Sequence, residues 1–163
     1  MKRTIPDNPE SDSIWRPDVT VACVVPRNDT FLLVEENIHQ TLVLNQPAGH
    51  LEPDETLSDA ARRETIEETG WDVSLDALIG VYQWTNLDNK RHFLRFTFAA
   101  TPVRHYPQRH LDDGIVRALW LSRDEIAADR SRLRSPMVLR CIDDWIAGKR
   151  QPLDVLHYLN AHP

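Results

Sequence analysis

The pattern of apolar and polar positions predicts a series of short strands interrupted by helices. Residues 18–26 are rich in β-branched side chains, and turn-forming residues separate them from a second such run over 30–35, which predicts a hairpin. Four further segments have the short, apolar pattern of strands. They are residues 42–46, 77–84, 93–100 and 116–121.

Three segments carry the signals of helices. Residues 56–69 have Thr56 in position to cap the first turn. Residues 122–125 read Ser-Arg-Asp-Glu, a capping box that predicts a short helix. Beyond Ser135, a capping residue followed by proline, apolar side chains repeat with helical spacing until Gly148. This order of elements predicts an α/β fold, with a mixed β-sheet sandwiched between helices (α/β/α).

Length and composition favour one globular domain. Residues 1–16 are polar, contain two prolines and show little periodicity, so we expect an N-terminal arm or tail before a single domain over 17–163. No apolar run approaches the roughly 18–20 residues that cross a bilayer, and no secretory signal is recognisable. Cys23 and Cys141 have apolar neighbours, which predicts buried free thiols and a cytoplasmic location.

The net charge of −6 limits the partners that the chain can have. An acidic protein does not bind nucleic acid or anionic membranes through broad electrostatic attraction. We therefore expect a small-molecule substrate, no nucleic acid and no membrane, with a monomer and a homodimer both open. If this acidic chain handles phosphates, a cation must supply positive charge at the site.

The helix predicted over 56–69 has an unusual face. At 100° per residue, Ala61, Glu64 and Glu68 fall within about 40° of Leu57, and Glu67 lies at the edge of that face. Carboxylates held this close repel one another, which a bound cation would reverse. Several oxygens without nearby His or Cys suit Mg²⁺ or Mn²⁺ better than zinc. The alternative is a solvated acidic face, the usual meaning of a run of charge.

The order of the residues favours the metal site. Residues 49–71 read GHLEPDETLSDAARRETIEETGW, which resembles the Nudix box G-x5-E-x7-R-E-U-x-E-E-x-G-U, where U is bulky and apolar. The matching residues are Gly49, Glu55, Arg63, Glu64, Glu67, Glu68 and Gly70, with Trp71 at the last apolar position. Thr65 departs from the pattern, because it stands where the first apolar residue is expected.

This resemblance implies a Nudix hydrolase that uses Mg²⁺, with Mn²⁺ as a substitute, to direct water at a phosphoanhydride bond. It implies that Glu64 is the general base and that Arg63 pairs with Glu55 to hold the preceding loop against the helix. The metal ligands that it implies are Glu64, Glu67, Glu68 and the backbone carbonyl of Ala48.

A later loop offers a competing base. Enzymes of this family often carry a Glu shortly before the strand that ends in Trp-Leu or Trp-Val. In this chain Gly114 stands at that place, preceded by Asp112 and Asp113. Either aspartate could replace Glu64 as the base, or both could belong to a solvated turn.

Outside the box the chain resembles the NudJ-type phosphatases, a subgroup of the Nudix enzymes. The similar segments are VTVACVV (19–25), NQPAGHLE (45–52), QW (83–84), FLRF (93–96) and LRSP (133–136). The subgroup implies activity on nucleoside tri- and diphosphates and on the hydroxymethylpyrimidine pyrophosphate of thiamine metabolism.

Five residues are candidates for binding such a substrate: Gln46, His50, Gln83, Trp84 and Arg95. Amides can read the edge of a heterocycle and an indole can stack on its face. The alternatives are core packing for Trp84, and contact with solvent for Gln83 and Arg95.

Three other functions stay open. The chain could hydrolyse ADP-ribose or nucleotide-sugar diphosphates, or be a non-catalytic nucleotide-binding Nudix module. The second is disfavoured because no carboxylate of the box is missing. An interaction protein that docks through its C-terminal helix is also disfavoured, since that helix has the apolar residues that core packing needs. The absence of a basic aromatic patch argues against RNA decapping.

Overall fold

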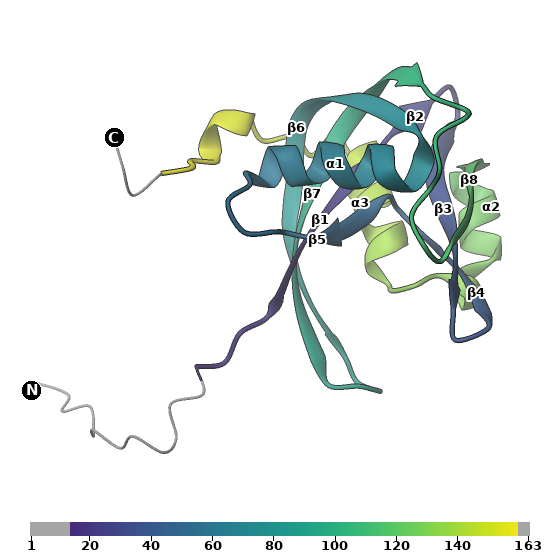
Figure 1. Cartoon of the computed structure of the whole chain (residues 1–163), viewed down its shortest axis with the longest axis horizontal. Coiled ribbons are helices and arrows are strands. Elements are labelled where there is room, and N and C mark those ends of the chain that lie inside the picture. Colours follow the sequence, from purple (N-terminus) through teal and green to yellow (C-terminus); the bar gives the residue numbers. More distant parts are fainter. Residues whose placement is uncertain (1–13, 160–163) are drawn as a thin grey trace, which may run out of the picture.

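The strands form two four-stranded sheets in the computed structural model, which describes residues 14–159 (Figure 1). The first sheet contains, in spatial order, β5 (Ala48–His50), β1 (Asp18–Val24), β7 (Arg91–His105) and β6 (Trp71–Asn86). The second is built around β3 (Thr30–Ile38), which pairs with β2 (Pro26–Arg27), β4 (Thr41–Asn45) and β8 (Ile115–Ser122). Most of the expected N-terminal arm, residues 1–13, lies outside the described residues, as do residues 160–163.

The first sheet is mixed, as the sequence predicts. β1 runs parallel to β7, with Thr20 opposite Arg95, while β5 and β6 pair antiparallel with their neighbours. β6 and β7 are 16 and 15 residues long, about twice their predicted lengths. The predicted segments form their centres, but backbone pairing continues beyond them, into the buried Val73 and Leu75 at the start of β6 and into polar residues such as Arg91 and His105 at the ends of β7. The result is a long hairpin whose tip projects away from the helices (Figure 1).

The helices are α1 (Leu57–Thr69), α2 (Arg123–Ala128) and α3 (Met137–Ile146), with single 3₁₀ turns at Arg130–Arg132 and Leu153–Val155. The Thr56 hydroxyl accepts a hydrogen bond from the Asp59 N–H (3.0 Å), and α1 ends at Gly70, whose φ is +70°. The predicted capping box of α2 is also present. Within the described chain, no helix is both long and apolar enough to cross a membrane.

The two long helices cover opposite faces of the first sheet, which confirms the predicted α/β/α arrangement (Figure 1). Val21 and Cys23 on β1 pack with Ala60 and Ala61 of α1. The intervening Val24 belongs to the core that α3 completes, because neighbouring side chains on a strand point to opposite faces.

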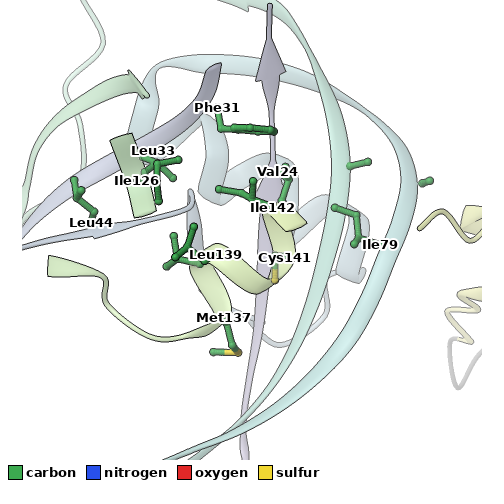
Figure 2. Close-up of a cluster of buried hydrophobic side chains, with 13 residues drawn as sticks. Val24, Phe31, Leu33, Leu44, Ile79, Ile126, Met137, Leu139, Cys141 and Ile142 are labelled. Atoms are coloured by element: carbon green, nitrogen blue, oxygen red, sulfur yellow. The ribbon is translucent and has the colours of Figure 1, made fainter. Parts of the chain in front are cut away.

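Both cysteines are fully buried free thiols, as expected. Burial raises the pKa of Cys23 to about 12, so its thiol stays protonated. Figure 2 shows Cys141, Leu139 and Ile142 of α3 pointing into a cluster that includes Val24 and Ile79. The C-terminal helix is therefore a core element, in keeping with the sequence argument against a docking helix.

The beginning of α3 differs from the prediction. The side chain of Ser135 forms no capping hydrogen bond, and the helix starts after Pro136 instead. Only the Ser135 carbonyl takes part, accepting from the Val138 N–H at 3.2 Å. The Ser135 hydroxyl has no hydrogen-bond partner among the described residues, and Ser135 borders a cavity.

Candidate active site

A cavity of about 430 Å³ lies where the C-terminal half of α1, the strand β5 and the start of α3 meet. We call it the acidic cavity. It is lined by Thr20, Glu36, Asn45, Ala48, Gly49, His50, Glu52, Arg63, Glu64, Glu67, Glu68, Trp84, Phe93, Arg95, Asp112, Arg134, Ser135 and Met137. All of the predicted site residues line it except Glu55, Gln46 and Gln83.

Three carboxylates form a cluster in this cavity. Oxygens of Glu64, Glu67 and Asp112 all lie within 4.8 Å of one another. Asp112 is brought to α1 by its backbone N–H, which donates to the Glu67 carbonyl at 3.1 Å. Asp113 lines a smaller neighbouring cavity instead. Of the two aspartates that the sequence leaves open, Asp112 is therefore the one that joins the glutamates.

Glu68 is buried beside the cluster and lines the same cavity. Its side chain accepts a hydrogen bond from the Ala48 N–H (2.8 Å), which ties α1 to β5. Burial raises the pKa of Glu68 to about 9, an effect that this hydrogen bond opposes and the nearby Glu36 and Glu64 carboxylates reinforce. Burial likewise raises the pKa of Glu64, against the influence of Arg63. Without a cation, Glu68 therefore holds its proton at neutral pH.

Arg63 holds the cluster and the preceding loop together. Its Nε and Nη2 donate to the two oxygens of Glu55 at 3.0 and 2.8 Å, which is the pair that the sequence predicts. Nη2 also donates to the His50 carbonyl (3.0 Å). Nη1 reaches Glu64 at 2.7 Å and Glu67 at 3.1 Å. These bonds lower the pKa of Glu55 and raise that of Arg63, so both stay charged.

The donor atoms of the cluster fit a hard divalent cation. Its side chains supply only carboxylate oxygens, and the cluster contains no His or Cys. Oxygen ligands of this kind suit Mg²⁺ or Mn²⁺, whereas zinc sites usually include nitrogen or sulfur. Burial of Glu68 next to other carboxyls fits the same conclusion, because a bound cation would favour its ionised form.

Gln46 and Gln83 do not meet in this cavity, contrary to the expectation that both contact the ligand. Gln46 is 1% exposed, and its Nε2 donates to the Val138 carbonyl at 2.7 Å, so it fastens α3 to the strands. Gln83 is exposed and lies on the face of β6 opposite its neighbour Trp84. The alternation of side chains along a strand separates these two residues, which adjoin in sequence.

Trp84 forms an aromatic wall of the cavity. Its ring stacks on that of Phe93, with centroids 5.4 Å apart and planes inclined by 22°. Trp84 also lines a second cavity, of about 550 Å³, which it shares with Arg134 and Ser135 and which reaches the hairpin residues Asn86 and Asp88. A ligand held at the cluster can therefore extend over the indole toward the hairpin.

Several polar residues of the inner lining are buried without a hydrogen-bond partner among the described residues, and all of them except Arg95 were missed by the sequence analysis. Thr20, Asn45, Arg95 and Ser135 are all at most 6% exposed, and each has a buried polar atom without a hydrogen-bond partner among the described residues. Arg95, which the sequence leaves between phosphate contact and solvent, is buried rather than solvated. Burial lowers its pKa. The available signal was weak: single polar residues at inward positions of otherwise apolar strands.

Comparison with known proteins places these features in a family. Residues 16–140 match the NUDIX domain model. The chain is 44% identical over 147 residues to Phosphatase NudJ of Escherichia coli K12, covering 90% of this chain and 95% of that protein.

Solved structures agree with this match. A NUDIX hydrolase from Nitrosomonas europaea superposes with a TM-score of 0.88 at 49% identity, covering 90% of this chain and 99% of that one. A bifunctional NMN adenylyltransferase/ADP ribose pyrophosphatase from Francisella tularensis, complexed with AMP and a Mn ion, has a TM-score of 0.62 at 21% identity. The match covers 83% of this chain and 43% of that one, and shows only a shared fold.

Proposed function

The chain belongs to the Nudix family of hydrolases, which act on pyrophosphate bonds, and from this membership we propose its substrates and its metal. We infer that it uses Mg²⁺, or Mn²⁺ in its place, to cleave nucleoside tri- and diphosphates and the hydroxymethylpyrimidine pyrophosphate of thiamine metabolism. The observation that carries the proposal is the Glu64, Glu67 and Asp112 cluster, which opens into a cavity walled by Trp84. The similarity to Phosphatase NudJ supports it.

In this proposal the carboxylates of α1 hold the cation and accept the proton from the attacking water. Glu64, Glu67 and Glu68 would bind the cation together with the Ala48 carbonyl, and Asp112 would add a fourth carboxylate. When bound, the cation neutralises the pyrophosphate oxygens and lowers the pKa of the attacking water. Glu64, a member of the carboxylate cluster, would take the proton from that water.

Arg63 and Glu55 keep this base in position. The Arg63 guanidinium bonds to Glu64 on one side and to Glu55 on the other, so it links the loop to the helix. The contact with the His50 carbonyl extends the same brace to β5. The Glu64 carboxylate therefore has a fixed orientation toward the attacking water, and general base catalysis requires such an orientation.

The organic part of the substrate would stack on Trp84, and His50 and Arg95 would face its phosphates. Stacking accepts any flat heterocycle, since every base has a π-face. This tolerance suits a substrate range that includes both nucleotides and a pyrimidine ester. The positions of Gln46 and Gln83 leave them no part in this contact.

The test is an assay of nucleotides and pyrimidine pyrophosphates with Mg²⁺, Mn²⁺ or EDTA, in which phosphate and pyrophosphate release are measured separately. We expect hydrolysis with either metal and none with EDTA. Undiminished turnover in EDTA would refute the metal site. Cleavage of ADP-ribose or nucleotide sugars in preference to the whole panel would refute the substrate assignment while leaving the site intact.

A further inference from the structure

We propose that the acidic cavity contains a second phosphate site, formed by Arg95, Thr20, Ser135 and the N-terminus of α3. This inference rests on the proposed function, which it deepens: the site would hold the substrate phosphate that is not attacked. Its residues are different from those of the carboxylate cluster, although both sets line the acidic cavity.

Arg95 is the central feature of this site. It lines the cavity yet is only 6% exposed, and its Nε and Nη1 have no hydrogen-bond partner among the described residues. No carboxylate of residues 14–159 lies within ion-pair distance of it, whereas Arg63 in the same cavity bonds to three. A buried guanidinium without an anion is costly, and its fork of donors matches the oxygens of a phosphate.

Two hydroxyls accompany this guanidinium. Thr20 on β1 is the register partner of Arg95 on β7, so the two side chains stand next to each other on one face of the sheet. Ser135 borders the same cavity. Thr20 Oγ1 and Ser135 Oγ are both buried, and neither has a partner within the described part of the chain. Hydroxyls can donate to phosphate oxygens, so all three side chains offer the same kind of contact.

The N-terminus of α3 adds positive potential at this place. α3 is ten residues long, and no side chain caps its first turn. Ser135, the residue that would normally cap it, lines the cavity, as does Met137 at the first helical position. An uncapped helix N-terminus attracts anions through its free N–H groups and its dipole. A bound phosphate would explain both the missing cap and the unpaired arginine, because one phosphate oxygen could accept from the free N–H groups of α3 in place of the Ser135 hydroxyl while another accepts from Arg95.

The competing explanation is that Arg95 only offsets the negative charge of Glu36 and Glu68, which influence it at longer range. That role would need neither the free hydroxyls nor the uncapped helix. It also makes a different prediction. A counter-ion for carboxylates would affect metal affinity, whereas a phosphate site would bind phosphate when no metal is present.

The experiment is titration of the full-length protein with inorganic phosphate in EDTA, followed by ³¹P NMR and isothermal titration calorimetry. We expect saturable binding by the wild type, at least tenfold weaker binding by Arg95→Met, and roughly threefold to tenfold weaker binding by Ser135→Ala. Arg104→Met is the control matched in charge, since Arg104 lies on the same strand about 30 Å away at ~3.3 Å per residue. It should bind phosphate like the wild type.

The outcomes separate this inference from the proposed function. Phosphate binding that is absent in the wild type, or unchanged in both Arg95→Met and Ser135→Ala, would overturn the second site even if the enzyme hydrolyses its substrates. Displacement of phosphate by a nucleoside without phosphates would also overturn it, because the residues would then bind the heterocycle. Loss of binding in both variants, with unchanged Mn²⁺ affinity by electron paramagnetic resonance, would support it whatever the substrate assay shows.

Discussion

The carboxyl group of Glu64 lies directly against Gly49, so closely that a β-carbon at residue 49 would overlap it. Gly49 sits in β5, in register with Val21 of β1, and its backbone is therefore fixed by the sheet. Neither the strand nor the carboxyl can give way without disturbing the site. The glycine that opens the family motif is needed here for space rather than for an unusual backbone angle.

Gly49→Ala should therefore reduce activity with little effect on folding. The added methyl would push Glu64 aside, and a displacement of about 1 Å in a catalytic group can cost on the order of 10²-fold in rate. Steady-state kinetics and a thermal melt measure the two effects. In a Glu64→Gln background the same change should cost much less, because the group that it displaces is already inactive. Full additivity of the two losses would contradict this account.

Glu64→Gln should lower kcat by roughly 10²–10⁴-fold if Glu64 is the general base. Asp112→Asn tests the rival, since Asp112 belongs to the same cluster. Asp113→Asn is the matched control, because Asp113 is adjacent but lines another cavity. A loss below tenfold for Glu64→Gln, together with a large loss for Asp112→Asn, would assign the base to Asp112.

Glu68→Gln should change how stability depends on pH. The pKa of Glu68 is raised on folding from 4.5 to about 9, so the folded state binds its proton more tightly than the unfolded state. Its contribution to stability is therefore complete below pH 4.5 and is lost as the pH rises to 9. In EDTA, the Tm of the wild type should fall over this range relative to that of Glu68→Gln, whose amide does not titrate.

Glu67→Gln is the control for this measurement, because it lies one residue away and keeps Glu68. It should follow the wild type. If Tm depends on pH in the same way for the wild type and Glu68→Gln, folding does not raise the proton affinity of Glu68. Mg²⁺ should raise the Tm of the wild type more than that of Glu68→Gln, since binding to the folded state stabilises it. An equal response would remove Glu68 from the metal site.

Trp84→Ala should raise KM more than it lowers kcat. A stacking contact is worth about 1–3 kcal/mol per base and changes little in the transition state. Trp84→Phe keeps an aromatic face toward Phe93 and should keep most of the affinity. An unchanged KM with a lower Tm in Trp84→Ala would show that the indole serves packing against Phe93 instead.

The helix that carries the glutamates could be predicted because its information is local. Glu64, Glu67 and Glu68 share one turn and one face, so helical spacing alone brings them together. Asp112 could not be assigned in the same way. Its place in the cluster depends on the hydrogen bond from its N–H to the Glu67 carbonyl, a contact between segments far apart in sequence.

The lining of the cavity was harder to predict for a related reason. Gln83 and Trp84 adjoin in sequence but face opposite sides of β6, and Arg95 looks like a solvated position until α3 covers it. The alternation along a strand shows that neighbouring side chains point to opposite faces of the sheet. It does not show which of these faces other elements cover. Ser135 illustrates the same limit, since local sequence assigns its hydroxyl to a helix cap that the fold does not form.

The tip of the long β6–β7 hairpin and the carboxylates of α1 can change independently in evolution. Its outer residues Asn86 and Asp88 border the second cavity, whereas the carboxylate cluster lies on α1 and the loop at Asp112. Residues near the hairpin tip lie outside the two buried core clusters and outside the carboxylate cluster. If α1 carries the catalytic groups, a duplicated gene could acquire a new substrate through changes at a few exposed hairpin positions, while selection preserves α1.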